Sequence, residues 1–299
     1  MKILLNRKPI NGPWGGGNLF IKNFCDSMIK LGHKVVHTIQ KDIDVLFIIN
    51  PRYDDLGISI NEAIKYKQKH PNVKIIQRIN DCDARKGTKD VDSLLINCSK
   101  HLDMTIFVSE WMKNYFLEKE WKCKNNNVVI NGVEVVSSVI DKMNNGKINI
   151  VTHHWSDNYL KGFDVYDSLD TFVKKDNNFT FTYIGRDRGT FKNTKVINPL
   201  VGRDLYNELK KYDVYISASR FDPGPNHILE SINCNLPTFV HKNGGGCVEF
   251  AGNDHVFDDF NHLIKILVSK EYVKNKNSFY NWNTCISQYN DILKELVSK

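Results

Sequence analysis

Two carboxylates near a Pro-Gly turn are the first candidates for ligand chemistry in the sequence. Asp222 and Glu230 lie eight positions apart in the segment Phe221-Asp222-Pro223-Gly224-Pro225-Asn226-His227-Ile228-Leu229-Glu230. The turn and a predicted helix start place Asp222 in a loop and Glu230 about one turn into the helix. Such carboxylates accept hydrogen bonds from hydroxyl-rich groups, although Asp222 could instead cap the helix and Glu230 could be solvated.

The start of the same helix is a candidate phosphate site, because its N–H groups and dipole attract anions. Pro225 has no N–H, so the donors come mainly from Asn226, His227 and Ile228. Gly224 is included because glycine lets the backbone approach a ligand closely.

A lysine at the end of a polar loop is the candidate cation. After His153-His154-Trp155-Ser156, the chain reaches Lys161-Gly162-Phe163 just before a predicted helix. There an ammonium could face a phosphate, and a solvated lysine is the alternative. The two histidines lack an H-E-x-x-H pattern and nearby ligands at metal spacing, so no metal site is expected.

Two glycine turns complete the candidates. Gly15, Gly16 and Gly17 close the segment Asn11 to Asn18, between a predicted strand and a helix, where backbone N–H groups could hold an anion. The segment matches neither G-x-G-x-x-G nor the P-loop, so a flexible turn is the alternative. Gly244-Gly245-Gly246 could admit a ligand or only reverse the chain.

Apolar runs alternating with amphipathic stretches predict the elements that position these residues. This alternation is typical of parallel sheets covered by helices on both faces. The polar segment 141–147 interrupts it and predicts a domain boundary, giving domains at 1–143 and 144–276 and a last helix within 277–299. The predicted strands are 2–5, 35–38, 45–49, 74–77, 104–108, 127–130, 148–152, 179–184, 195–197, 214–218 and 238–241. The predicted helices are 18–31, 60–69, 110–117, 163–174, 203–210, 226–233 and 282–297.

Length and composition agree with two folded domains. The chain has 299 residues, twice the roughly 150 typical of one domain. With 41% hydrophobic and 25% charged residues it is unlike a disordered chain. It lacks an apolar run that could span a bilayer, and its amino terminus turns polar too early for a signal peptide, so we expect a cytoplasmic protein.

The cysteine pattern and the net charge limit the kinds of metal site, disulfide and binding partner that we expect. The seven cysteines are scattered and never form C-x-x-C, which argues against a disulfide framework or a zinc knuckle. The net charge of +7 suits anionic partners, namely nucleic acid, an acidic membrane face or a phosphorylated small molecule. No basic cluster interleaved with aromatic residues appears, so nucleic acid is the weakest of these.

Taken in order, the motifs resemble glycosyltransferase family four, the retaining nucleotide-sugar enzymes with the GT-B fold. The resemblance covers almost the whole chain. It implies an α/β protein of two Rossmann-like, doubly wound domains facing a cleft, with the last helix packed back on the first domain. The segments that carry it are the glycine loop before 31–35, 108–113, 128–134, Lys161-Gly162-Phe163, Tyr183-Ile184-Gly185-Arg186, 209–214, Asp222 to Glu230, and Pro237 with Gly244-Gly245-Gly246 and Glu249.

The resemblance also implies residue roles. Lys161 would neutralise the diphosphate of a UDP-, GDP- or ADP-sugar, Glu230 would hold the ribose and Asp222 the transferred sugar. The N–H groups of Asn226, His227 and Ile228, with the Gly15 to Gly17 loop, would surround the phosphates without a metal or cofactor. Arg186 and Leu205 are the candidates for base contacts. The acceptor would be a glycan, a lipid-linked sugar or another hydroxyl compound, and peripheral contact with an acidic membrane stays open.

Three departures from the family pattern matter. The family's Gly-Arg before the Lys-Gly motif is replaced by His153-His154-Trp155-Ser156, where Ser156 or a histidine would substitute. Asp222 replaces the first glutamate, which shortens its reach by one methylene. In the first domain Arg78-Ile79-Asn80-Asp81-Cys82-Asp83 stands where an acceptor-side histidine is expected, so Asp81 or Asp83 would orient the acceptor unless this loop is solvated.

Two other functions stay open at this point. A nucleotide-sugar epimerase shares the two-domain architecture and would convert the donor without an acceptor. A non-catalytic module that binds nucleotide sugars or glycans would explain the missing arginine and a chain that is short for this fold.

Overall fold

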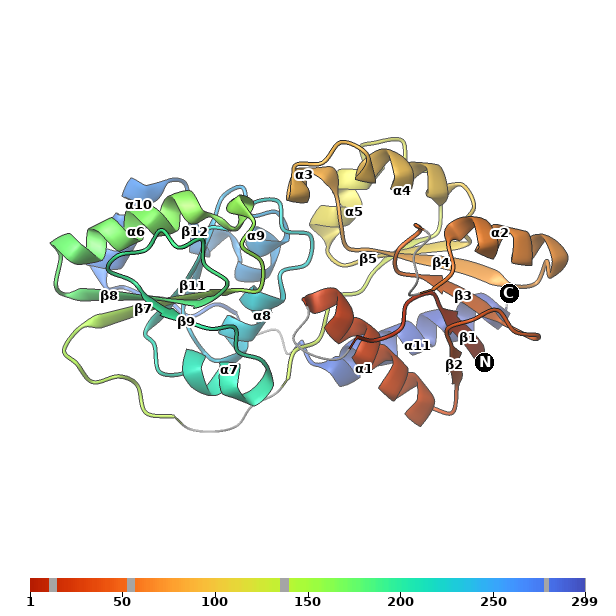
Figure 1. Ribbon diagram of the computed structural model, residues 1–299, viewed down its shortest axis with the longest axis horizontal. Helices are drawn as coiled ribbons and strands as arrows, with labels where there is room; N and C mark the ends of the chain where they lie inside the picture. Colours follow the sequence, from red (N-terminus) through yellow and green to blue (C-terminus); the bar gives the residue numbers. More distant parts are fainter. Residues whose placement is uncertain (11–14, 53–56, 135–139, 277–279, 299) are drawn as a thin grey trace. The chain divides into compact units, whose positions relative to one another are not determined.

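The computed structural model describes residues 1–10, 15–52, 57–134, 140–276 and 280–298. The chain forms two compact units, one made of Met1–Gly132 with Tyr280–Lys299 and the other of Val133–Phe279. Each unit contains a six-stranded sheet whose strands pair in parallel (Figure 1). The predicted α/β class with two doubly wound domains is therefore confirmed.

The first unit is built on a sheet with strand order β2-β1-β3-β4-β5-β6. Helices α1 and α11 cover one face, and α2, α4 and α5 cover the other (Figure 1). The strands are β1 (Lys2–Leu5), β2 (Lys34–Val36), β3 (Val45–Ile48), β4 (Lys74–Ile79), β5 (Met104–Phe107) and β6 (Asn126–Val128). The helices are α1 (Gly16–Lys30), α2 (Ile60–Lys69), α3 (Asp83–Lys86), α4 (Val91–Ser99), α5 (Glu110–Leu117) and α11 (Trp282–Ser298).

The last helix belongs to the first unit because its apolar stripe meets that of α1. Trp282, Ile286, Tyr289 and Leu293 recur at helical spacing and are buried in one cluster with α1 and the sheet. Within the cluster the rings of Phe20, Phe24, Phe47 and Tyr289 have centroids 5.1 to 6.3 Å apart. Aromatic rings at these separations bury large apolar areas, so the chain end is an integral part of the first core.

The second unit has strand order β12-β11-β10-β7-β8-β9. Helices α6 and α10 pack on one face of this sheet through a shared apolar cluster (Figure 1). The strands are β7 (Ile148–His154), β8 (Phe179–Gly185), β9 (Lys195–Ile197), β10 (Val214–Ser217), β11 (Thr238–His241) and β12 (Val256–Phe257). The helices are α6 (Phe163–Lys175), α7 (Gly202–Leu209), α8 (Asn226–Asn233), α9 (Gly246–Ala251) and α10 (Phe260–Ser269), with short 3-10 turns at Tyr159–Lys161 and Asn253–His255.

The boundary between the units differs from the predicted one near residue 143. The first unit's own run of chain ends at Gly132, and the polar segment 141–147 belongs to the second unit. There the Met143 N–H donates to the Lys211 carbonyl (3.0 Å), and Asn145 hydrogen-bonds Asn149 at the start of β7 (2.9 Å). The polar segment 141–147, which the sequence predicts as a boundary, is therefore held to the second unit by backbone and side-chain amide hydrogen bonds.

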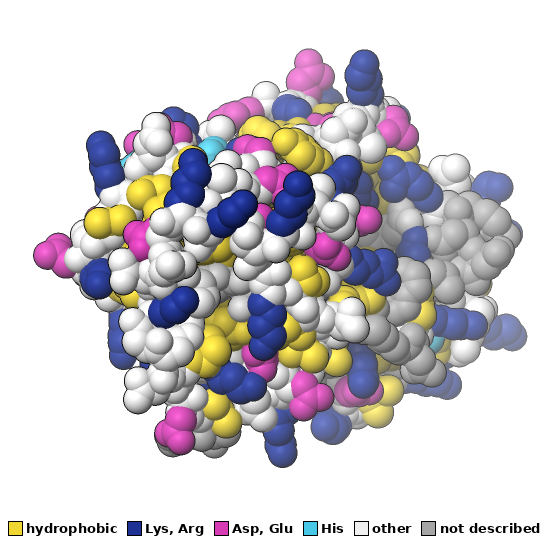
Figure 2. Space-filling view, turned by 60° about the vertical axis from the view of Figure 1, so that its left-hand side comes forward, with side chains coloured by type: hydrophobic (Ala, Val, Ile, Leu, Met, Phe, Trp, Pro, Cys, Tyr) yellow, Lys and Arg dark blue, Asp and Glu magenta, His cyan; other side chains and the backbone are white. Residues whose placement is uncertain are grey.

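Surface and interior agree with the composition. All seven cysteines are free and buried. Among the described residues no helix is long and apolar enough to cross a membrane. On the face drawn in Figure 2, lysine and arginine side chains are scattered and acidic side chains lie between them. This face therefore presents a mixed surface rather than one continuous basic patch.

Asp170 on α6 is a structural carboxylate whose replacement is expected to weaken the second unit. It is 6% exposed and accepts hydrogen bonds from the backbone N–H groups of Lys192, Asn193 and Thr194 (2.7 to 3.1 Å) and from the Thr194 hydroxyl (2.7 Å). Burial acts to raise the pKa of Asp170, but these hydrogen bonds outweigh it and hold the pKa below its ordinary value. We expect Asp170→Asn to lower the free energy of unfolding at pH 7 by about 2 kcal/mol.

The pH dependence of this effect has a defined sign. A depressed folded-state pKa stabilises the fold above the unfolded pKa of about 3.9, and the gain disappears as the pH falls through the lower folded value. Urea unfolding should therefore separate wild type from Asp170→Asn at pH 7, and the difference should shrink as the pH falls below about 3.9. The exposed Asp254→Asn is the matched control. Equal urea midpoints for wild type and Asp170→Asn at pH 7 would contradict this role.

Candidate functional site

The candidate site of the second unit lies at the carboxyl edge of its sheet, where the strand order reverses. The chain proceeds from β7 to β8 and β9 on one side, then returns to place β10, β11 and β12 on the other, so β7 and β10 are neighbours. The loops after two such strands diverge and leave a crevice, which is where open parallel sheets bind ligands. Lys161 follows β7, and Asp222 and Glu230 follow β10.

Lys161 and Asp222 form a buried ion pair across this point. The Lys161 Nζ lies 2.9 Å from Asp222 Oδ2, and the two side chains are only 11% and 9% exposed. The Ser219 hydroxyl donates to the same carboxylate oxygen (3.1 Å). Because a buried charge without a partner is costly, the ammonium and the carboxylate each hold the other in its charged form.

The glycine after Lys161 explains how this pair comes together. Gly162 has φ +99°, and a Cβ at this position would lie 2.3 Å from the Ala218 Cβ at the end of β10. A side chain here would therefore push the Lys161 loop away from β10. Glycine is required both for the backbone angle and for the close approach.

Arg220 links the same two loops from behind. Its guanidinium makes a bidentate pair with Asp164 at the start of α6 (2.7 and 2.6 Å). The backbone N–H of Arg220 donates to the Leu160 carbonyl (2.8 Å). Burial acts to raise the pKa of Asp164, but the Arg220 contacts are stronger and lower it. Arg220 thus holds the loop of Lys161 and the loop of Asp222 together.

A second side-chain contact joins the end of β7 to α8. His153 Nε2 lies 2.8 Å from Glu230 Oε2, with the side chains 10% and 14% exposed. Glu230 thus lies one turn into α8, as the sequence predicted, but it is partly buried against a histidine rather than solvated. Sequence analysis considered a histidine of this segment only as a substitute for the family's arginine, and it missed the contact of His153 with Glu230.

The first turn of α8 contains the predicted phosphate donors. Pro225 precedes the helix, and Asn226, His227 and Ile228 begin it, next to the half-buried Gly224. The Ile228 N–H donates to the Pro225 carbonyl (3.1 Å), so it is already used inside the turn. The donation of N–H groups from this turn to a phosphate stays a prediction.

Three other predicted residues lie around the β7 and β8 ends or in α7. The Ser156 hydroxyl accepts the Asn158 N–H (3.1 Å), so Ser156 organises the loop that leads to Lys161. Arg186, just after β8, holds its guanidinium 4.2 Å above the Trp155 ring, a cation–π contact at the sheet edge. Leu205 on α7 is 5% exposed, which leaves little of its side chain for a base.

In the first unit the predicted glycines occupy the equivalent place. Gly15 precedes α1, and Gly16 and Gly17 are its first residues, after β1 and beside the β1–β3 reversal of that sheet. Residues 11–14 of the same motif lie outside the described residues. Gly15 to Gly17 and the Lys161, Asp222 and Glu230 segments therefore belong to different units.

The two acceptor-side carboxylates have structural partners. Asp83 accepts from the Thr88 hydroxyl (2.5 Å) and the N–H groups of Val91 and Asp92 (3.0 Å each). Burial acts to raise the pKa of Asp83, but these hydrogen bonds together lower it. Asp81 pairs with the exposed Lys86. Asp83 is thus committed to the turn before α4, and Asp81 is the better placed of the two for an acceptor role.

Comparison with known proteins identifies the architecture. No protein-family model and no curated protein matches the sequence. Solved structures do match, several of them over nearly the whole chain. HepE from Anabaena, in complex with UDP and glucose, matches with a TM-score of 0.72 at 13% identity, covering 99% of this chain and 100% of that one. The fold is that of the GT-B glycosyltransferases.

Two further structures agree. The sucrose-phosphate synthase from Thermosynechococcus elongatus gives a TM-score of 0.73 at 11% identity, with 99% of each chain covered. WaaG, a glycosyltransferase involved in lipopolysaccharide biosynthesis, gives 0.62 at 12% identity, with 100% of this chain and 98% of that one covered.

Proposed function

We propose that this protein is a retaining, metal-independent glycosyltransferase that moves a sugar from a nucleotide-diphosphate sugar to a hydroxyl of a glycan or lipid-linked acceptor. The observation that carries the proposal is the pair of side-chain contacts, Lys161 with Asp222 and His153 with Glu230, at the strand-order reversal of the second sheet. The order of motifs resembling family four supports it. A structure of HepE contains UDP-glucose, which fits a donor of this class.

Lys161 would bind the donor diphosphate by exchanging one anion for another. Its ammonium is held by Asp222 and is almost buried, so it is already placed and largely dehydrated before the donor arrives. A diphosphate entering the crevice brings more negative charge than one carboxylate and can take over the ammonium. The N–H groups at the start of α8, with the positive end of its dipole, would add to the attraction.

The two carboxylates would then hold hydroxyl groups. Asp222, relieved of part of its pairing with Lys161, would accept hydrogen bonds from the transferred sugar. Glu230, which is 14% exposed and oriented by His153, would accept hydrogen bonds from both hydroxyls of the ribose. This order places the ribose toward α8 and the sugar toward the Asp222 loop, with the diphosphate at Lys161 between them.

The chemistry would follow from this placement. When the bond between the anomeric carbon and the phosphate oxygen breaks, negative charge grows on the leaving diphosphate and positive charge on the sugar ring. The Lys161 ammonium and fixed N–H dipoles would stabilise the negative charge on the diphosphate without a metal. The departing phosphate oxygen would take the proton of the acceptor hydroxyl, which attacks from the same face and retains the configuration. Asp81 in the first unit would serve the acceptor side, and the N–H groups of Gly15 to Gly17 would help to surround the phosphates.

Stereochemistry and metal dependence test these finer statements together. The protein is incubated with α-linked UDP-, GDP- and ADP-sugars in EDTA, and the anomer first released is followed by proton NMR. We expect the α-sugar first and an unchanged rate in EDTA. Release of the β-anomer would overturn retention, loss of activity in EDTA would overturn metal independence, and recovery of an epimerised nucleotide sugar would favour the epimerase.

A further inference from the structure

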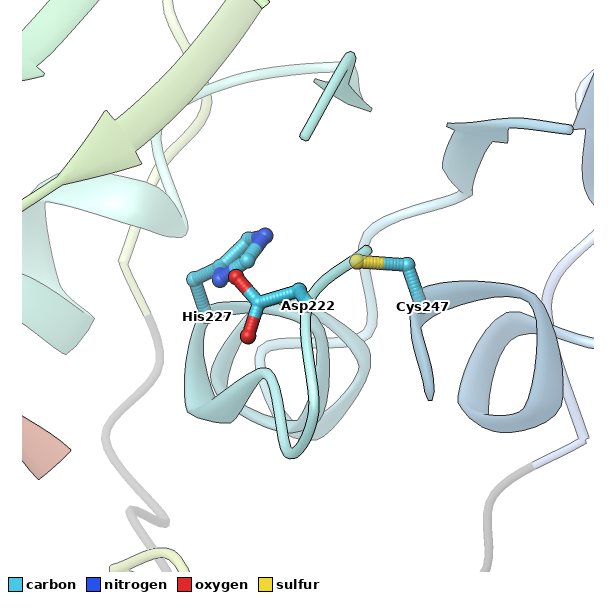
Figure 3. A group of neighbouring side chains, drawn as sticks. All are labelled: Asp222, His227 and Cys247. Atoms are coloured by element: carbon cyan, nitrogen blue, oxygen red, sulfur yellow. The ribbon is translucent and has the colours of Figure 1, made fainter. Parts of the chain in front are cut away.

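Three side chains capable of binding a metal converge beside the donor loop. Asp222 from the loop after β10, His227 from the first turn of α8 and Cys247 from the start of α9 are 6%, 7% and 0% exposed. One ligand atom from each lies within 4.8 Å of the other two. In Figure 3 the imidazole and the carboxylate lie side by side, and the sulfur points toward them from the opposite helix.

We propose that Asp222, His227 and Cys247 form a binding site for Zn²⁺, and that zinc bound there excludes the nucleotide sugar. The first part rests on the geometry of the cluster alone. The second part rests on the proposed function, because Asp222 is shared with the donor site.

The ligand set suits zinc better than the hard cations. A thiolate, an imidazole and a carboxylate are its common ligands, whereas Mg²⁺ and Ca²⁺ take oxygen. Zinc bonds of about 2.0 to 2.3 Å place ligand atoms roughly 3.5 Å apart, so the three side chains need only close in slightly from their present separation. Three protein ligands leave the fourth position for water.

Neighbouring serines orient two of the ligands. His227 Nε2 lies 2.9 Å from Ser217 Oγ, a contact that orients the imidazole ring. Lys161 and Ser219 both contact Oδ2 of Asp222 and orient its carboxylate. Such outer contacts fix the ligands before the metal binds.

The glycine turn before α9 brings Cys247 to the other two ligands. The Asp222 N–H donates to the Gly244 carbonyl (3.0 Å), and the Gly246 N–H donates to the Asp222 carbonyl (2.8 Å). A Cβ on Gly246 would lie 2.9 Å from the Pro223 carbonyl oxygen. The three glycines, whose role the sequence left open, thus allow the two backbone segments to lie in direct contact.

Lys161 and zinc compete for the same carboxylate. With the ammonium 2.9 Å from Asp222, a divalent cation on the other oxygen is repelled, so zinc affinity in the wild type is held down by Lys161. One substitution should therefore have opposite effects on two ligands. Lys161→Ala is expected to weaken nucleotide binding and to tighten zinc binding roughly tenfold or more.

Binding also involves a proton. The Cys247 thiol must lose its proton to solvent when the Zn–S bond forms, so zinc affinity should rise with pH across the neutral range. This dependence distinguishes a thiolate site from adventitious zinc on surface carboxylates.

Zinc binding to the full-length reduced protein, measured by competition with a colorimetric chelator and without nucleotide, tests the proposal. We expect one Zn²⁺ per chain. Cys247→Ser should lower the zinc affinity about 100-fold or more, since even loss of a residue that only orients a metal ligand typically costs 10- to 100-fold. Cys234→Ala, a buried thiol of the same unit, is the control and should bind normally. No binding at micromolar zinc, or equal affinity in wild type and Cys247→Ser, would overturn the site.

A second measurement tests the exclusion. In the wild-type protein, saturating zinc should abolish the rise in melting temperature caused by UDP, GDP or ADP. In Cys247→Ser the same zinc concentration should leave this rise intact. Simultaneous binding of zinc and nucleotide would overturn the exclusion. Because zinc is titrated without nucleotide, the metal site can fail while donor turnover persists, and the reverse.

Discussion

Lys161→Ala is expected to lower the affinity for the preferred nucleoside diphosphate about a hundredfold and to remove most of its effect on the melting temperature. Loss of one partner of a buried charge contact typically costs 2 to 5 kcal/mol, and about 3 kcal/mol corresponds to this change in affinity. The ammonium contacts the Asp222 carboxylate in the proposed site (2.9 Å). Titration calorimetry with UDP, GDP and ADP measures the effect.

The control separates binding from folding. Lys161→Ala leaves the Asp222 carboxylate buried without its cation, so the melting temperature of the protein alone should also fall. The shift caused by nucleotide is therefore the readout, rather than the starting value. Lys242→Ala removes an exposed lysine 3.6 Å from Asp258 and should leave both unchanged. Wild-type nucleotide affinity in Lys161→Ala would exclude Lys161 from diphosphate binding.

Glu230→Gln is expected to weaken nucleotide binding about thirtyfold, but only for nucleotides that carry a complete ribose diol. A carboxylate can accept from both hydroxyls, whereas an amide presents one oxygen and a competing NH₂ group, a loss of about 2 kcal/mol. Calorimetry should therefore show a large difference between wild type and Glu230→Gln for the ribonucleoside diphosphate.

The 2′-deoxy form of the same nucleotide is the internal control. It lacks one hydroxyl, so wild type and Glu230→Gln should bind it with more similar affinities. Equal losses for the two nucleotides would mean that Glu230 acts through the fold, by way of its contact with His153, and does not touch the ribose.

The fold was largely predictable because its elements are set by local patterns. The helices at 60–69, 110–117 and 226–233 agree with the prediction residue for residue, since a capping residue or proline and apolar 3/4 spacing mark them. The short helix α4 was missed, because its start depends on Asp83, whose carboxylate contacts are a tertiary feature.

The site was only partly predictable, because its contacts join residues far apart in the chain. Lys161 and Asp222 are 61 positions apart, and His153 and Glu230 are 77 apart. Lys161 and Asp222 lie in loops and Glu230 lies in the first part of α8, as sequence analysis predicted. Only the adjacency of β7 and β10, which the alternation of strands and helices leaves undetermined, brings them together. The adjacency of β10 and β11 in turn places His227 within reach of Cys247.

Turnover of a donor panel by wild type and Lys161→Ala tests the central claim most directly. Release of nucleoside diphosphate from UDP-, GDP- and ADP-sugars is measured without an acceptor, with Lys242→Ala as the control. The account predicts release from at least one donor by wild type and Lys242→Ala, and a rate at least ~100-fold lower in Lys161→Ala. Binding of a nucleotide sugar without release from any donor, or equal release by wild type and Lys161→Ala, would contradict it.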